Sequence, residues 1–304
     1  MSQTTIRLLQ HEDYPYIEAM DTGIEDDYVP RVFDHLVTGN NRLYGLFTND
    51  QLVSMAGYTI YAGRYAMLGR LRSDRRYRGN NYATTNVSHV LNEAFQLNGI
   101  QWVGANTQEE NTPARRVLEK IGLKVYSTLH GATTDDTSML ETGAKTWQPI
   151  HSIKQKRDWL QAVYVQSATV FPYECYYAFP ASDELFSDDD LQKWSFFENE
   201  AKTRIVITKY DQKKHHYLHT VYPWHDMTEQ NGLWETIANE YRKLQTQTEE
   251  ETYIWMDMTK EKAASLPSNH QFKLPSPWML HGMERAEWEQ SKAQIQKPKT
   301  IVGR

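Results

Sequence analysis

Arginine, glycine and asparagine are concentrated in residues 72–85 of this 304-residue chain. The turn Arg78-Gly79-Asn80-Asn81 connects an apolar, strand-like run to the start of an amphipathic helix pattern. A loop of small residues that leads into a helix presents free backbone N–H groups, and such groups bind anions. The neighbouring arginines add charge-assisted contacts to phosphate. The stretch therefore predicts a binding site for a phosphorylated cofactor.

Two regular elements must position this loop. Residues 66–71 are mostly apolar and are expected to form a strand, and the helix after the loop has one apolar face. That face consists of Ala83, Val87, Val90, Leu91, Ala94 and Phe95. Taken alone, a Gly-Asn turn after a strand is usually only a turn, so a second motif is needed to support the site.

The second motif follows within thirty residues. Residues 100–105 have the composition of a buried strand, and residues 111–123 have the pattern of a short capped helix. Asn111 or Thr112 can cap its start, Pro113 suits its first turn, and Gly122 suits its end.

In these two blocks the chain resembles the GNAT superfamily of N-acetyltransferases, over roughly residues 4–130. The family's cofactor motif, Gln/Arg-x-x-Gly-x-Gly/Ala, is matched around residues 78–83, with Asn81 in place of the inner glycine. The second block matches residues 111–123, with Leu123 where phenylalanine is commonest. The resemblance implies acetyl-CoA as cosubstrate and no metal. The residues expected to hold it are Leu71, Arg72, Arg78, Gly79, Asn80, Asn81, Tyr82, Ala83, Thr84, Asn111, Ala114 and Arg115.

Elementary chemistry explains this choice of residues. Gly79 lets the backbone approach a diphosphate, and Arg78 either contacts that charge or orders the loop. Asn81 adopts the left-handed conformation more readily than most residues that carry a side chain, but it leaves less room for the diphosphate than glycine would. By the resemblance, the strands part near Leu71–Arg72 and residues 103–105 to admit the pantetheine arm.

The implied reaction is transfer of an acetyl group from acetyl-CoA to a primary amine of a small molecule or a protein. Family members commonly use a tyrosine of the second block to protonate the departing thiolate. Leu118 occupies that position here, which leaves Tyr126 as a candidate acid and the base unassigned. Residues 25–27 (Glu25, Asp26 and Asp27) are candidates for binding a cationic acceptor, although adjacent acids are more often a solvated turn. A non-catalytic acyl-CoA sensor or scaffold is the alternative function.

Composition narrows the class of protein. The formal net charge of −6 argues against a general nucleic-acid binder, and no apolar run approaches membrane-spanning length. The single cysteine, Cys175, fits a reducing, cytoplasmic compartment and is expected to be a buried, inert thiol. The sequence is compatible with both a monomer and a homodimer.

The expected fold class is α/β, a mixed sheet flanked by helices, in two domains that span residues 1–140 and 141–304. Residues 124–129 are expected to close the first sheet and residues 278–285 the second. Between residues 204 and 285 the predicted order of strands and helices repeats that of residues 52–130, so the second domain is interpreted as a degenerate GNAT-like copy. Its loop at residues 223–232 contains two acids and no arginine. We therefore expect no cofactor there.

Three smaller features complete the expectations. His215, His216, His219 and His225 with Asp226 resemble metal ligands, but cross-strand packing is the favoured explanation and no metal is predicted. Residues 188–190 are expected to cap a helix at Leu191, and the tail from Gln290 is expected to be mobile.

Overall fold

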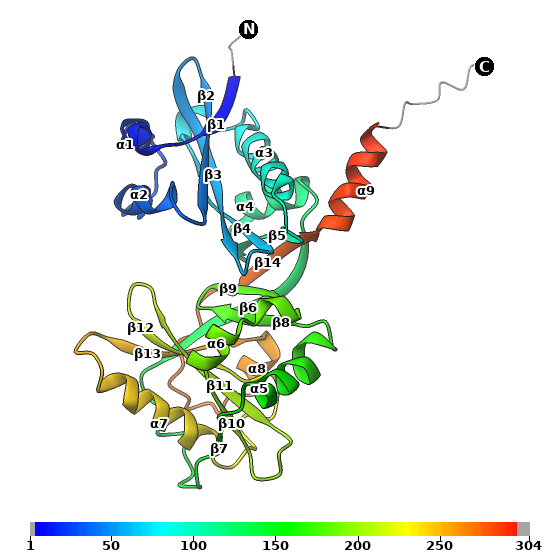
Figure 1. Cartoon of the computed structure of the whole chain (residues 1–304). Helices are drawn as coiled ribbons and strands as arrows, with labels where there is room; N and C mark the ends of the chain where they lie inside the picture. Colours follow the sequence, from blue (N-terminus) through cyan, green and yellow to red (C-terminus); the bar gives the residue numbers. More distant parts are fainter. Residues whose placement is uncertain (1–3, 297–304) are drawn as a thin grey trace. The chain divides into compact units, whose positions relative to one another are not determined.

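The computed structural model describes residues 4–296, which form two compact units (Figure 1). Unit 1 contains the described residues up to Thr107, then Asn111–Val125, and then those from Leu280 onward. Unit 2 contains Gln108–Glu110 and Tyr126–Met279. The chain therefore leaves unit 1 and returns to it at its C-terminal end.

Unit 1 is built on one mixed sheet with the strand order β1-β2-β3-β4-β5-β14. Neighbours from β1 to β4 are antiparallel, whereas β4 and β5 are parallel and are connected through helix α3. The strands are β1 (Thr4–Leu8), β2 (Asn41–Thr48), β3 (Gln51–Tyr61), β4 (Tyr65–Ser73), β5 (Trp102–Gln108) and β14 (Trp278–Glu284). The helices are α1 (Tyr14–Glu18), α2 (Phe33–Leu36), α3 (Tyr82–Gln96), α4 (Thr112–Lys120) and α9 (Arg285–Gln296), with short turns η1 (His11–Asp13), η2 (Pro30–Val32) and η3 (Arg75–Tyr77).

Both faces of this sheet are covered, because successive side chains of a strand point to opposite faces. On β2, Leu43 belongs to the core beneath α1 and α2, whereas Tyr44 belongs to the core beneath α3. Val87, Val90 and other predicted apolar residues of α3 are buried in that second core. Figure 1 shows α3 on one side of the sheet and α1 and α2 on the other.

The C-terminal segment completes unit 1. In β14, Gly282 lies under the indole of Trp102, where an added Cβ would come within 2.3 Å of the ring. Arg285 donates from Nε to the Ile100 carbonyl (2.6 Å). In α9, Trp288 stacks on Phe95 of α3 with ring centroids 5.0 Å apart. Strand β14 and helix α9 therefore belong to the core of unit 1.

Unit 2 repeats the pairing scheme of unit 1. Its sheet has the order β6-β13-β12-β11-β10-β7, with antiparallel neighbours except for the parallel pair β12–β13, which helix α7 connects. The strands are β6 (Lys124–Thr134), β7 (Gln148–Ile150), β10 (Ser195–Glu198), β11 (Ile205–Gln212), β12 (His216–Val221) and β13 (Thr252–Met258). A separate hairpin consists of β8 (Val170–Glu174) and β9 (Tyr177–Pro180). The helices are α5 (Ile153–Leu160), the π-turn η4 (Gln161–Val165), η5 (Asp183–Leu185), α6 (Asp188–Lys193), α7 (Leu233–Gln245) and α8 (Lys260–Ala264).

The closing strands are exchanged relative to the sequence-based expectation. The strand expected to close the first sheet, β6, pairs instead with β13 through residues 130–134. The strand expected to close the second, β14, lies beside β5. A single boundary after residue 140 therefore does not describe the two units. Local patterns identify a strand but not its partner, which is why the exchange was missed.

Other expectations fall close to the observed elements. The predicted order of strands and helices between residues 204 and 285, strand, strand, helix, strand, helix, strand, is observed as β11, β12, α7, β13, α8 and β14. Residues 188–190 begin α6, although the capping side chain is that of Ser187, which accepts from the Asp190 N–H. The tail expected to be mobile from Gln290 is helical to Gln296, and its remainder lies outside the described residues.

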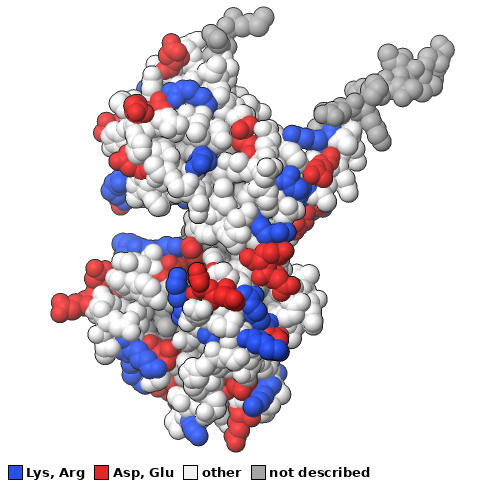
Figure 2. Space-filling view, viewed as in Figure 1, with Lys and Arg blue, Asp and Glu red and all other residues white. Residues whose placement is uncertain are grey.

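The surface is mixed in charge. Figure 2 shows Lys and Arg interspersed with Asp and Glu on the visible face of both units, so that neither sign forms a continuous field there. Within residues 4–296, no helix is both long enough and apolar enough to span a lipid bilayer.

Candidate functional site

The central strands of unit 1 part at one end. Strands β4 and β5 pair from Tyr65–Trp102 to Leu68–Ala105, and both strands then continue without further pairing to each other. A bulge on β4 accompanies the parting, since the register against β3 shifts between Gly69 and Arg72, and Arg70 is left-handed (φ 56°). Leu71 and Arg72 therefore lie in the parted segment of β4, whereas residues 103–105 of β5, where parting was also expected, are still paired with β4.

The loop between β4 and α3 has the backbone shape of an anion cradle. Gly79 (φ 88°) and Asn81 (φ 61°) are both left-handed. Asn81 precedes α3 without making a side-chain capping bond, and the first intrahelical bond runs from the Thr85 N–H to the Asn81 carbonyl (3.0 Å). The N–H groups of residues 82–84 therefore have no partner within the helix. A Cβ added at Gly79 would meet no atom within 4 Å, so this face of the loop is open.

A buried carboxylate holds the loop in place. Asp74, whose side chain is fully buried, accepts hydrogen bonds from the backbone N–H groups of Arg76 (2.9 Å) and Asp21 (3.3 Å) and pairs with the Arg76 guanidinium. Arg78 donates from Nη2 to the carbonyl of Thr22 (2.9 Å). Of the two roles considered for Arg78, the structure shows the ordering of the loop. The role of Asp74 was missed, although an acid within an arginine-rich stretch is a signal for internal pairing.

The acidity of Asp74 makes the stability of unit 1 pH-dependent. Hydrogen bonds from Arg76 lower the pKa of this carboxyl from 3.8 to about 2. A lowered pKa contributes stability that is complete above the unfolded value and is lost as the pH falls from about 4 to about 2, on the order of 2 kcal/mol. We expect the free energy of unfolding, measured with urea, to fall by at least that amount across this range, because the pKa values of other carboxyls such as Asp27 are lowered as well. The Asp74→Asn variant should lose this part of the pH dependence of stability, whereas Asp50→Asn, a substitution in an exposed turn, should retain it.

The predicted acceptor-binding acids do not act together. Asp27 forms a bidentate pair with Arg72 (2.7 and 2.8 Å), in which the two side chains are only 10% and 12% exposed. Burial is the largest single effect and raises the pKa of Asp27, but the hydrogen bonds from Arg72 and from the Val29 N–H, together with the charges of Arg72 and Arg31, lower it overall. Asp26 pairs with Arg31 on the surface, and Glu25 is exposed. The Asp27–Arg72 pair therefore anchors the segment between α1 and α2 to the end of β4.

That segment also carries a residue that the sequence did not single out. The Tyr28 ring is 46% exposed and lies 5.5 Å from the Arg72 guanidinium carbon. No local pattern distinguishes this tyrosine, because its position depends on the Asp27–Arg72 pair across 45 residues of chain.

The second motif forms helix α4 as expected. Asn111 caps it by accepting the Ala114 N–H at Oδ1 (3.2 Å), and the Arg115 N–H bonds to the Asn111 carbonyl (3.1 Å). Leu118, at the position where the family commonly has tyrosine, is buried in the core. Tyr126 belongs to unit 2. It lies on β6 (Lys124–Thr134), directly after the last residue of that strand that belongs to unit 1, and its role as the acid stays a prediction.

The corresponding helix start in unit 2 is occupied by the chain itself. The Glu235 carboxylate, in the first turn of α7, accepts the N–H groups of Thr142 (2.5 Å) and Ala144 (3.0 Å). A Cβ added at Gly232, just before α7, would lie 2.1 Å from the Lys145 carbonyl oxygen. Residues 142–147 thus cover the place where a diphosphate would approach.

The histidines that are close together in the sequence have different neighbours in the structure. His215 pairs with Glu251 (3.0 Å), and His216 contacts Glu250 (2.7 Å) and the Tyr210 hydroxyl (2.8 Å). The His215 ring packs 5.3 Å from that of Tyr253, which is the expected cross-strand packing. His219 is fully buried (0% exposed).

Comparison with known proteins agrees with this geometry. Residues 5–123 match the model of the Acetyltransferase (GNAT) family. These residues form a GNAT acetyltransferase domain. None of the curated protein sequences matches the chain.

Solved structures extend the likeness beyond the GNAT domain. A GCN5-related N-acetyltransferase from Sphaerobacter thermophilus has a TM-score of 0.53 at 14% identity, over 93% of this chain and 96% of that one. A candidate acetyltransferase from Pyrococcus horikoshii has a TM-score of 0.50 at 10% identity, over 92% and 89%. Because both cover nearly the whole chain, the fold of unit 2, and not that of the GNAT domain alone, is shared.

Proposed function

We propose that unit 1 binds acetyl-CoA and transfers its acetyl group to a primary amine of a small molecule or a protein. The observation that carries this proposal is the open loop at Gly79 and Asn81, which leads into the uncapped start of α3 inside the GNAT domain. The chemistry of the donors fits a diphosphate, since the N–H groups of residues 82–84 at the start of α3 have no partner within the helix.

Binding is assigned to the following residues. The N–H groups of residues 79–84 would receive the diphosphate, with Gly79 permitting close approach. The parted ends of β4 and β5, near Leu71 and Arg72, would flank the pantetheine arm, and Asn111, Ala114 and Arg115 would lie on its other side. Asp74 is a positioning residue, because it shapes the loop through Arg76.

The transfer itself requires little chemistry from side chains. The thioester is already activated, so the protein must hold a neutral amine near the carbonyl carbon and stabilise the oxyanion with backbone N–H groups. The amine nitrogen forms the new C–N bond and loses one proton, the C–S bond breaks, and the thiolate takes up a proton. Leu118 has no hydroxyl, so Tyr126 stays the candidate for the acid, and the base stays unassigned.

The lack of a hydroxyl at Leu118 also favours the second candidate, an acyl-CoA-binding sensor or scaffold without turnover. We favour the enzyme because positioning alone accelerates aminolysis of a thioester. In both proposals unit 2 binds no CoA, since its own chain covers the start of α7.

The two candidates are separated by binding and turnover measured on the same preparation. Calorimetry with CoA is expected to show one site per chain, and pantetheine, which lacks the diphosphate, should bind at least tenfold more weakly. Free-thiol release from acetyl-CoA is then followed with a panel of amines, polyamines and peptides. Release with at least one acceptor supports the enzyme. CoA binding without release from any acceptor supports the sensor, and absence of CoA binding contradicts both.

A further inference from the structure

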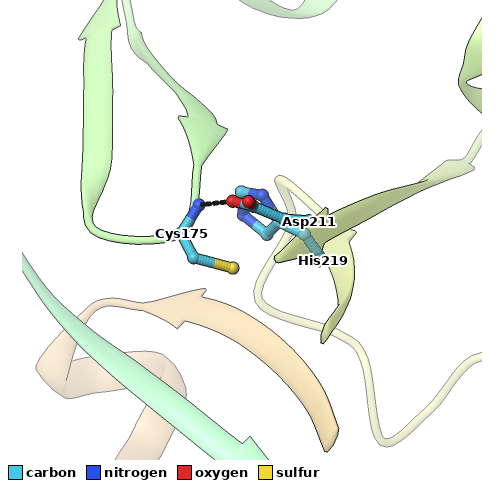
Figure 3. Close-up of side chains that lie close together, drawn as sticks. All are labelled: Cys175, Asp211 and His219. Carbon is cyan, nitrogen blue, oxygen red and sulfur yellow. Dashed lines mark hydrogen bonds between the residues drawn. The ribbon is translucent and has the colours of Figure 1, made fainter. Parts of the chain in front are cut away.

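Three potential metal-binding side chains meet in the interior of unit 2. Cys175 lies in the turn between β8 and β9, Asp211 is on β11, and His219 is on β12. Their ligand atoms, the thiol sulfur, a carboxylate oxygen and an imidazole nitrogen, all lie within 4.8 Å of one another. Figure 3 shows the three side chains gathered at one point between the hairpin and the sheet.

Sheet geometry places two of these groups together. In the β11–β12 ladder, His219 is opposite Lys209, and Asp211 is two residues further along β11. Asp211 and His219 are therefore diagonal neighbours on the same face of the sheet. The Cys175 N–H donates to Oδ2 of Asp211 (2.7 Å), which fixes the hairpin turn above this face.

His219 is oriented as a metal-binding histidine would be. It is fully buried, and its Nε2 contacts Oδ2 of Asp257 on β13 at 2.8 Å. Asp257 is itself held by the Trp255 indole N–H (3.1 Å). Among the described residues, the other ring nitrogen, Nδ1, has no hydrogen-bond partner although it is buried. A carboxylate that orients one imidazole nitrogen while the other stays available is the arrangement found around metal-bound histidines.

A cysteine nucleophile is the competing explanation for these groups. Such a nucleophile must be reached by its substrate, but Cys175 and His219 are both 0% exposed. An ion can instead be enclosed while the domain folds. The nearby ammonium of Lys209 is occupied elsewhere, because it donates to the carbonyls of Pro172 and Tyr173, each at 2.7 Å.

We propose that Cys175, Asp211 and His219 bind one zinc ion, with Asp257 orienting His219 and a water in the fourth position. Thiolate, imidazole and carboxylate together are donors that zinc accepts, whereas magnesium and calcium prefer oxygen alone. Binding displaces the proton of the Cys175 thiol to solvent. Zinc–ligand distances of about 2.0–2.3 Å require the three ligand atoms to draw in by about 1 Å when the ion binds.

The ion would join two separate sheets. The β8–β9 hairpin is not part of the main sheet of unit 2. A bond from Cys175 through zinc to Asp211 and His219 would fasten this hairpin to β11 and β12. The role is therefore structural, and it is independent of acetyl transfer in unit 1.

Refolding of the full chain in the presence of increasing cobalt tests this site, with the protein prepared without a histidine tag and freed of metal by chelation in urea. Cys175 is the only cysteine, so a thiolate-to-cobalt charge-transfer band in the unmodified protein reports its coordination directly. We expect the band to saturate at one Co²⁺ per chain, to disappear when one equivalent of Zn²⁺ is added, and to be accompanied by a rise in melting temperature with zinc. Absence of the band in protein that has refolded in saturating cobalt would overturn the proposal.

Variants locate the ligands. Cys175→Ser and His219→Gln should each weaken zinc binding at least 100-fold. The matched control is His216→Gln, which removes a histidine from the same strand that contacts Tyr210 and Glu250 instead. If either ligand variant is unfolded, the cobalt spectrum of the unmodified protein still decides. Zinc binding of Cys175→Ser at unchanged affinity would also overturn the assignment.

Discussion

Replacing Gly79 with alanine is expected to weaken CoA binding by about 100-fold or more. Gly79 has a φ of 88°, and its open side faces the region where the diphosphate would lie. A methyl group there strains the backbone by roughly 1–2 kcal/mol and also keeps phosphate oxygens away from the amide groups. Calorimetry with CoA measures the affinity, and thermal unfolding measures the strain.

Gly63→Ala is the matched control for that experiment. Gly63 is also left-handed (φ 65°), and a Cβ there would also meet no atom within 4 Å, but it lies in the turn between β3 and β4. Both variants should therefore lose similar amounts of stability, but only Gly79→Ala should lose affinity for CoA. Equal CoA affinity in the two variants would remove the loop from the binding site.

The features that the sequence predicted well are those determined by near neighbours in the chain. The loop at residues 78–81, the capped start of α4 and the apolar face of α3 all follow from spacing within one turn or one helix. The left-handed backbone at Asn81 was anticipated for the same reason, because Asn is among the few side chains that adopt it readily.

The features that the sequence did not predict depend on residues far apart in the chain. Arg72 and Asp27 were assigned to different ligands, but they bind each other across 45 residues. Cys175 was expected to be buried and is buried, yet nothing near it in the sequence indicates Asp211 or His219 as neighbours. Because side chains alternate along β12, the sequence did place His216 and His219 on opposite faces of the strand. Only the position of the β8–β9 hairpin shows which residues His219 faces.

The exchange of closing strands is the largest such feature, and it has a direct experimental consequence. A chain that ends at Met279 should lose the fold of unit 1 together with CoA binding, although the whole GNAT domain of residues 5–123 is still present. Without β14 and α9, Trp102 loses Gly282, Phe95 loses Trp288, and the Ile100 carbonyl loses Arg285. Exposure of two such aromatic side chains alone costs about 3–6 kcal/mol, a large part of the stability of a typical domain.

Near-UV circular dichroism and CoA calorimetry on that truncated chain measure the loss. A chain ending at Gln296 is the control, because it retains β14 and α9 and should bind CoA as the full chain does. Residues 1–140 expressed alone should fail for the same reason as the chain ending at Met279. If the chain ending at Met279 instead bound CoA with an affinity within twofold of that of the full chain, β14 and α9 would be an accessory to unit 1 rather than part of its core. Unit 1 would then be complete without its C-terminal segment, contrary to the packing of Trp102 on Gly282.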